Sequence, residues 1–130
     1  MVRVVAFGGR DFTDAEWLNH VLDRVHSHCG ISTLIHGDAL GADTLAKKWA
    51  ICAGVPQLPF PANWKWGQPQ VGFARNTRMI QVGKPELGIG FPGGPGTRDM
   101  KAQLEAAGIE VITPALLYKV PHGTIEALPR

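Results

Sequence analysis

Glycine-rich segments and arginines occur together in this sequence, and both kinds of residue suit the binding of an anion. Seven of the 16 glycines fall in three short segments, which are Gly8-Gly9, Gly37 to Gly41 and Gly93-Gly94-Pro95-Gly96. Backbone N–H groups in such segments are not covered by side chains, and the planar guanidinium of arginine suits phosphate. Arg10, Arg75 and Arg98 are the arginines nearby. These residue types predict a phosphate site.

Each of these segments follows a predicted strand and precedes a predicted helix. Apolar, β-branched runs predict strands over residues 2–7, 33–36, 55–60, 87–91 and 109–112. Apolar residues at helical spacing predict helices between them, at residues 13–29, 45–53, 72–82 and 98–107. A helix N-terminus carries a partial positive charge, so each segment would present its amides to an anion.

The alternation of strands and helices predicts one α/β domain over residues 1–130. Its sheet should be open and mainly parallel, with five strands and with helices on both faces. Pro56 and Pro59 place the strand at 55–60 on the sheet edge. The Pro-rich C-terminal tail, residues 113–130, has no assigned structure. In a parallel sheet, ligands bind beyond the carboxyl ends of the strands, where all three segments lie.

Composition and charge exclude several other classes of protein. The net charge of +2 is too small to indicate nucleic-acid binding, and no apolar run is long enough to cross a membrane. Cys29 and Cys52 are predicted to be free thiols, as is usual in a cytoplasmic protein. Neither a G-x-G-x-x-G nor a P-loop motif follows a predicted strand, and the histidines do not form a metal set. We therefore expect no cofactor and no metal ion.

Four motifs, in this order and spacing, resemble those of the YspA, YpsA-related branch of the SLOG superfamily. They are Gly8-Gly9-Arg10-Asp11-Phe12, His36-Gly37-x-Ala39-x-Gly41-Ala42-Asp43, Arg75-Asn76-x-x-Met79 and Phe91-Pro92-Gly93-Gly94-x-Gly96-Thr97-x-Asp99-Met100. The resemblance covers about residues 2 to 112. It implies a Rossmann-like fold and a small nucleotide-derived ligand, such as a nucleoside phosphate or an ADP-ribose-like molecule.

The resemblance also implies which residues contact the ligand. Phosphate is expected at Gly93 to Thr97 and Arg75, and the ribose or base near the first two segments. The expected contacts are Gly8, Gly9, Arg10, Asp11, His36, Gly37, Gly41, Ala42, Asp43, Arg75, Asn76, Pro92, Gly93, Gly94, Gly96, Thr97 and Asp99. Trp64 and Trp66 could stack on a base or pack beneath their own loop.

Enzymatic activity is an open question at this point. The superfamily includes the LOG phosphoribohydrolases, in which a catalytic Glu stands where this chain has Met100. If the protein is an enzyme, it is a nucleotide N-glycosidic hydrolase whose candidate catalytic residues are Asp99 and Arg75. Asp11 and Asp43 are the other carboxylates that could replace the missing Glu. Single-strand DNA binding, as in the DprA branch, is the other alternative, which the low net charge disfavours. By analogy with LOG proteins, a homodimer is the expected oligomer if one forms.

Several candidate residues also have a purely structural interpretation. Thr97 is a predicted helix N-cap, and Asp99 would be favoured by the dipole in the first turn of that helix. Asp43 has the same first-turn interpretation. His36, at the end of a strand, is either a hydrogen-bonded structural residue or part of the site.

Overall fold

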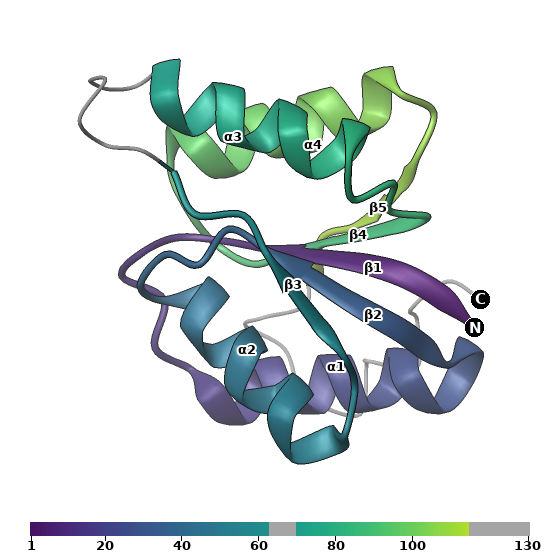
Figure 1. The fold of residues 1–130 in the computed structure, drawn as a ribbon. Helices are drawn as coiled ribbons and strands as arrows, with labels where there is room; N and C mark the ends of the chain where they lie inside the picture. The colour runs from purple at the N-terminus through teal and green to yellow at the C-terminus, as the bar shows by residue number, and fades with distance from the viewer. Residues whose placement is uncertain (63–69, 115–130) are drawn as a thin grey trace.

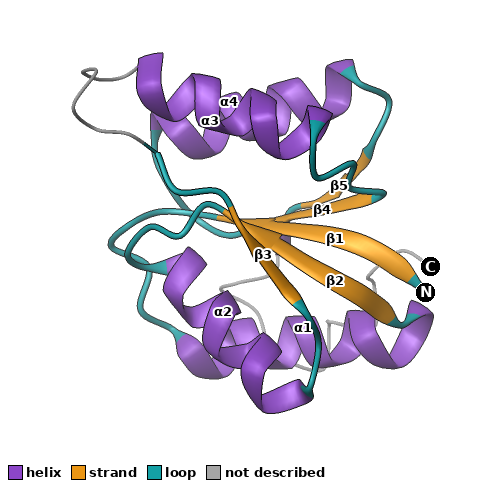
Figure 2. Cartoon of the chain, in the orientation of Figure 1, coloured by secondary structure: helices purple, strands orange, loops and turns teal. Residues whose placement is uncertain are grey.

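The computed structural model describes residues 1–62 and 70–114, which form a single sheet covered by helices (Figures 1 and 2). Trp64, Trp66 and the tail from residue 115 lie outside the described residues. The elements follow one another as β1 (Val2–Phe7), α1 (Ala15–Cys29), β2 (Ile31–His36), α2 (Ala42–Ala53), β3 (Gln57–Pro59), α3 (Gln70–Gln81), β4 (Leu87–Gly90), α4 (Pro95–Ala106) and β5 (Glu110–Ile112). The predicted alternation of strands and helices is confirmed.

The sheet is parallel throughout, with the strand order β3-β2-β1-β4-β5. Helices α1 and α2 cover one face and α3 and α4 cover the other, as predicted (Figure 1). The chain builds outward from β1 to β3 and then returns to the other side of β1. The loops after β1 and β4 therefore diverge to opposite faces, and such a switch point is where parallel sheets bind ligands.

Each face of the sheet has its own apolar core. In β1, Val4 and Ala6 pack with the helices α1 and α2, where Trp17 and Trp49 are also buried. Val5 and Phe7 point to the opposite face and pack with Met79 of α3 and with Met100 and Leu104 of α4. The alternation along β1 is what a strand buried on both faces requires. The apolar spacing in this part of the sequence predicts that Ala107 points inward with Met100 and Leu104, but Ala107 is exposed.

Helix and strand ends differ from the predicted ones at several places. Helix α4 begins at Pro95 rather than Arg98, with Gly94 as N-cap, so Thr97 lies inside the first turn and is not the cap. Proline is favoured at the first helical position because its missing N–H has no partner there in any helix. Strand β3 is only three residues long, but it lies at the sheet edge as predicted. Within the described residues, no helix combines the length and apolar character that crossing a bilayer requires.

Two glycines of β4 make room for the core on the α3 and α4 side. A Cβ atom at Gly90 would lie 2.8 Å from Cζ and 2.9 Å from Cε2 of Phe7, whose ring is enclosed by the core. A Cβ atom at Gly88 would meet the Cδ1 methyl of Leu104 at 2.7 Å. A terminal methyl can rotate away, whereas the ring of Phe7 has to shift as a rigid unit, which costs more.

We therefore expect Gly90→Ala to lower the free energy of unfolding by about 1–3 kcal/mol, because its added methyl group would press on the Phe7 ring. Urea denaturation followed by tryptophan fluorescence measures this difference. Gly88→Ala is the matched control and should cost less, since only the Leu104 methyl has to move. Equal losses in the two variants would contradict this explanation of the strand's glycines.

Candidate functional site

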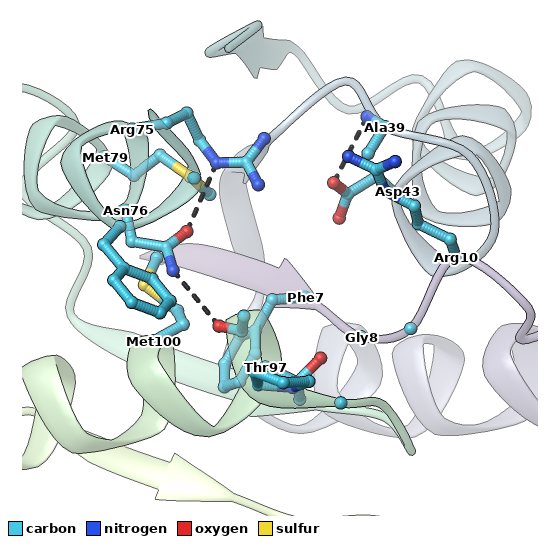
Figure 3. Close-up of a pocket in the computed structure, with 16 residues that line it drawn as sticks. Phe7, Gly8, Arg10, Ala39, Asp43, Arg75, Asn76, Met79, Thr97 and Met100 are labelled. Atoms are coloured by element: carbon cyan, nitrogen blue, oxygen red, sulfur yellow. Dashed lines mark hydrogen bonds between the residues drawn. The ribbon is translucent and has the colours of Figure 1, made fainter. Parts of the chain in front are cut away.

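A cavity of about 390 Å³ opens at the carboxyl ends of β1 and β4, between α2, α3 and α4 (Figure 3). Nine of the expected ligand contacts line it, namely Gly8, Gly9, Arg10, Asp43, Arg75, Asn76, Gly94, Gly96 and Thr97. Eight others do not line it, namely Asp11, His36, Gly37, Gly41, Ala42, Pro92, Gly93 and Asp99. Arg98 does not line it either and is exposed.

Arg75 of α3 reaches across the cavity towards the loop after β2. Its Nη1 donates a hydrogen bond of 2.7 Å to the carbonyl oxygen of Gly37, and its Nε donates one of 3.2 Å to Oδ1 of Asn76. Gly37 has no Cβ atom, and any Cβ there would collide with this guanidinium. Arg75 therefore has structural partners in addition to the ligand role expected from its type.

The charge of Arg75 lies in a partly dehydrated place. Burial lowers the pKa of its guanidinium, an effect that the Asp43 carboxylate opposes and the nearby Arg10 reinforces. Figure 3 shows Arg75 on one side of the cavity and Asp43 with Arg10 on the other. The two cations and the single anion thus face a common space.

Asp43 lies in the first turn of α2 and is only 5 % exposed. One carboxylate oxygen, Oδ2, accepts a hydrogen bond of 3.3 Å from the backbone N–H of Ala39. Burial raises the pKa of this carboxyl above 3.8, and the positive charge of Arg75 and backbone N–H groups offset part of the rise. Among the described residues, Asp43 supplies the one carboxylate that lines the cavity.

His36 is enclosed and holds the loop after β2 in place. Its side chain is fully buried, its Nδ1 accepts from the backbone N–H of Asp38 at 3.0 Å, and its Nε2 lies 2.5 Å from Oε1 of Gln57. These partners select the tautomer with the proton on Nε2. Asp38 has a φ of 55°, a left-handed conformation that Asp and Asn tolerate better than most residues. The structural interpretation of His36 accounts for all of these contacts.

Several site glycines are required by backbone packing. The amide of Gly9 donates to the carbonyl oxygen of Pro92 at 2.8 Å, and a Cβ at Gly9 would lie 2.9 Å from Cα of Gly93. Gly41 has a φ of +78°, and a Cβ there would collide with the carbonyl of Gly9. In these places the three loops touch through their main chains.

Gly94 and Gly96 are different, because no described atom beyond the adjoining residues and the helix's own backbone lies within 4 Å of a Cβ built at either position, and neither has a positive φ. Both line the cavity at the start of α4, where no side chain caps the helix. The described part of the chain thus leaves the space beside these two glycines open.

Asp99 lies one turn into α4 and faces neighbouring polar side chains. Its Oδ2 accepts from Nδ2 of Asn76 at 3.0 Å and from Nε2 of Gln103 at 2.7 Å. Because α4 starts at Pro95, Asp99 is not in the first turn, and the first-turn dipole interpretation is wrong. Met100, which does line the cavity, is 1 % exposed and belongs to the core around Phe7.

Sequence reasoning missed several residues that line the cavity. These are Phe7, Ala39, Gly72, Phe73, Met79, Pro95 and Met100. Part of the signal was available, since Gly72 and Met79 lie at helical spacing from Arg75 and Asn76 and so share their face of α3. Phe7 carries no such signal, because only the pairing of β1 with β4 brings it beneath the cavity.

Asp43→Asn should change how stability depends on pH. Folding raises the pKa of Asp43, so the folded protein retains a proton that the unfolded chain has lost above about pH 3.8. The stabilisation of the folded protein by this carboxyl is therefore fully present below that pH and is lost as the pH rises through the pKa of Asp43 in the folded state. Relative to the native protein, the Asn variant should gain stability as pH increases, in urea denaturation from pH 4 to pH 8. A difference that does not vary with pH would contradict this assignment.

Comparisons with known proteins agree with this fold. The chain is 33% identical over 122 residues to the Gene 61 protein of Mycobacterium phage D29. This match covers 86% of this chain and 95% of the phage protein. The structure is similar to a Moco carrier protein from Chlamydomonas reinhardtii, with a TM-score of 0.62, 19% identity, and coverage of 88% and 77% of the two chains. It is also similar to Acinetobacter baumannii MurG, with a TM-score of 0.57, 11% identity, and coverage of 87% of this chain and 34% of that chain.

At 19% and 11% identity, the two structural likenesses show a shared Rossmann-like fold. A model of the YspA, cpYpsA-related SLOG family matches residues 2–67, which contain the first two glycine-rich segments. Together with the identity to the phage protein, this match shows that the chain belongs to the YspA, cpYpsA-related SLOG family, as its motifs predict.

Proposed function

We propose that this protein binds a nucleotide or a nucleotide-derived molecule in the cavity at the carboxyl ends of β1 and β4. The class includes nucleoside phosphates and ADP-ribose-like compounds. A volume of about 390 Å³ is within the range of small-molecule sites. Binding would let the protein act as a sensor or a processor of such a molecule, in the cytoplasm, where free thiols such as Cys29 and Cys52 are usual.

The open space beside Gly94 and Gly96 is the observation that carries this proposal. Glycine costs about 0.5–1 kcal/mol relative to alanine within an element, so it is normally kept where a Cβ atom would clash or φ is positive. Neither reason applies at these positions. Glycine is also favoured at the N-cap position that Gly94 occupies, so the open space beside Gly96, inside α4, is the stronger observation. A ligand that approaches the main chain of α4 would supply the missing reason.

The phosphate would lie against the first turn of α4. The amides there point out of the helix end, which carries the positive pole of the dipole, and the Thr97 side chain lines the same wall. Arg10 and Arg75 add two positive charges around the cavity, and Asp43 is the one described lining residue of opposite charge. This balance favours an anionic ligand.

The remaining wall of the cavity is apolar and would hold the sugar or base. Phe7, Phe73, Met79 and Met100 supply it. Aromatic rings and thioethers pack well against a flat base. The Asp43 carboxylate, at the edge of this wall, could accept a hydrogen bond from a ribose hydroxyl or from a base N–H.

We expect Gly94→Val to abolish ligand binding while the protein stays folded, because its side chain would fill space that is open in the native chain. The measurement is a thermal-shift screen with phosphate, AMP and ADP-ribose; a ligand at 100 times its Kd adds about 2.7 kcal/mol to native stability. Ala102→Val is the control, since it puts the same side chain on the exposed face of the same helix. An unchanged ligand-induced shift in Gly94→Val would contradict the proposed phosphate position.

Hydrolysis of an N-glycosidic bond is a second candidate function, favoured by the position of Asp43 across the cavity from Arg75 (Figure 3). Such a reaction passes through a cationic, oxocarbenium-like state that a carboxylate would stabilise. The LOG-type position is occupied by the thioether of Met100, and Asp99 is held outside the cavity by Asn76 and Gln103. Asp43 alone among the described residues could take this part.

We expect the native protein to release little or no free base from AMP and related nucleotides, since loss of a catalytic carboxylate costs roughly 10²–10⁴-fold or more. Chromatographic detection of free adenine tests this. Turnover that disappears in Asp43→Asn and survives in Asp99→Asn would instead establish the hydrolase, with Asp43 as its carboxylate.

A further inference from the structure

A chain of hydrogen bonds connects α4 to α3 behind the cavity. Oδ2 of Asp99 accepts from Nδ2 of Asn76 at 3.0 Å and from Nε2 of Gln103 at 2.7 Å. Gln103 also donates to the carbonyl oxygen of Phe73 at 3.2 Å and accepts from the Thr77 hydroxyl at 2.8 Å. Asp99 is therefore an acceptor held between the two helices.

This chain determines which way the amide of Asn76 faces. Its Nδ2 donates both to Asp99 and, at 3.1 Å, to the carbonyl oxygen of Gly96. A carboxylate and a carbonyl can only accept, so the NH₂ group must point at them. Oδ1 of Asn76 then points to Nε of Arg75, from which it accepts at 3.2 Å. Asn76 is 4 % exposed, which leaves little room for another orientation.

The guanidinium of Arg75 is thereby held at two points. Asn76 accepts from its Nε, as Figure 3 shows. The carbonyl oxygen of Gly37 accepts from its Nη1. The plane of the group is set by these two bonds, and its remaining donors lie on the side of the cavity. The same amide of Asn76 holds Gly96, so Arg75 and the first turn of α4 are positioned together.

We propose that Asp99 is a positioning residue, which fixes the Asn76 amide so that Arg75 and the first turn of α4 together present their donors to an anionic ligand. This inference rests on the proposed function for its consequence in binding, but not for the contacts themselves. A charged acceptor suits this task because its hydrogen bonds are about twice as strong as neutral ones. Asp99 acts through Asn76 and does not touch the ligand.

The first experiment needs no ligand. The Nε–H signal of Arg75 in ¹⁵N spectra, assigned by its absence in Arg75→Lys, reports whether this donor is hydrogen-bonded. We expect its exchange with water to be slow in the native protein and faster by about fivefold or more in Asp99→Ala, the factor for a lost hydrogen bond of ordinary strength. Asp99→Asn should keep slow exchange, since an amide oxygen can accept from Asn76 in place of the carboxylate.

The second experiment titrates inorganic phosphate into the same samples and follows the backbone amides of Gly96 and Thr97. Asp99→Ala should weaken phosphate binding by roughly three- to tenfold, and Asp99→Asn by less than about twofold. Glu105→Gln removes an exposed acid on the same helix and should change neither signal. If Asp99→Ala does not fold, Asp99→Ser replaces it, because a shorter side chain cannot reach Asn76 yet stays polar.

The two experiments separate the possible failures. An Arg75 Nε–H that stays slow in Asp99→Ala and in Asp99→Ser overturns the positioning role. If Asp99→Asn loses phosphate binding as fully as Asp99→Ala, the charge itself is required at the ligand and the inference is wrong. If phosphate leaves the native amides unshifted, the proposed anion site fails, while the exchange of Arg75 still decides the role of Asp99.

Discussion

The close approach of the loops after β1 and β4 is the constraint on which the rest of the site depends. Gly9 donates its amide proton to the carbonyl of Pro92, and the two loops touch at Gly9 and Gly93 without any intervening side chain. The third loop joins them where Ala42 donates to the carbonyl of Gly9. Because the chains after β1 and β4 then leave for opposite faces, a cavity opens between helices that would otherwise pack together. A side chain at Gly9 or Gly93 would separate the loops and remove the walls of that cavity.

Two charged side chains beside the cavity, Asp43 and Arg75, are buried and half-buried respectively. Both side chains lose hydration, which lowers the pKa of Arg75 and raises the pKa of Asp43. Both shifts favour the neutral form of the group. The mutual attraction of the two charges recovers part of the cost of lost hydration, and the carbonyl of Gly37 and the amide of Asn76 satisfy two donors of the guanidinium. Opposite charges that lose hydration in this way add little net stability compared with apolar residues of the same volume. Retaining them at the mouth of a cavity is understandable if the charges serve a ligand.

The apolar wall of the cavity, which includes Met100, differs from the LOG motif that the sequence otherwise resembles. Met100 stands where LOG phosphoribohydrolases have the catalytic Glu, and it packs in the core with Phe7, Met79 and Leu104. A carboxylate placed there would be surrounded by apolar atoms on the sheet side, and its ionised form would be costly. The neighbouring acid, Asp99, is turned towards α3 and accepts hydrogen bonds from Asn76 and Gln103. The same motif positions therefore line a cavity here, and Asp43 is the one acid among the described lining residues.

The sequence alone determined the alternation of elements, the parallel sheet and the rim on which the glycine-rich loops meet, because these follow from local periodicity and from glycine and proline chemistry. It also identified Arg75, Asn76 and Gly94, which line the cavity. Only the tertiary structure decided that His36 faces Gln57, that Asp99 faces Asn76, and that Phe7 lies under the site. The same holds for the glycines, since Gly9 and Gly94 look alike in sequence, yet one touches another main chain and the other faces open space. Such differences depend on atoms from elements far apart in the chain, and no local pattern encodes which of those atoms will be near.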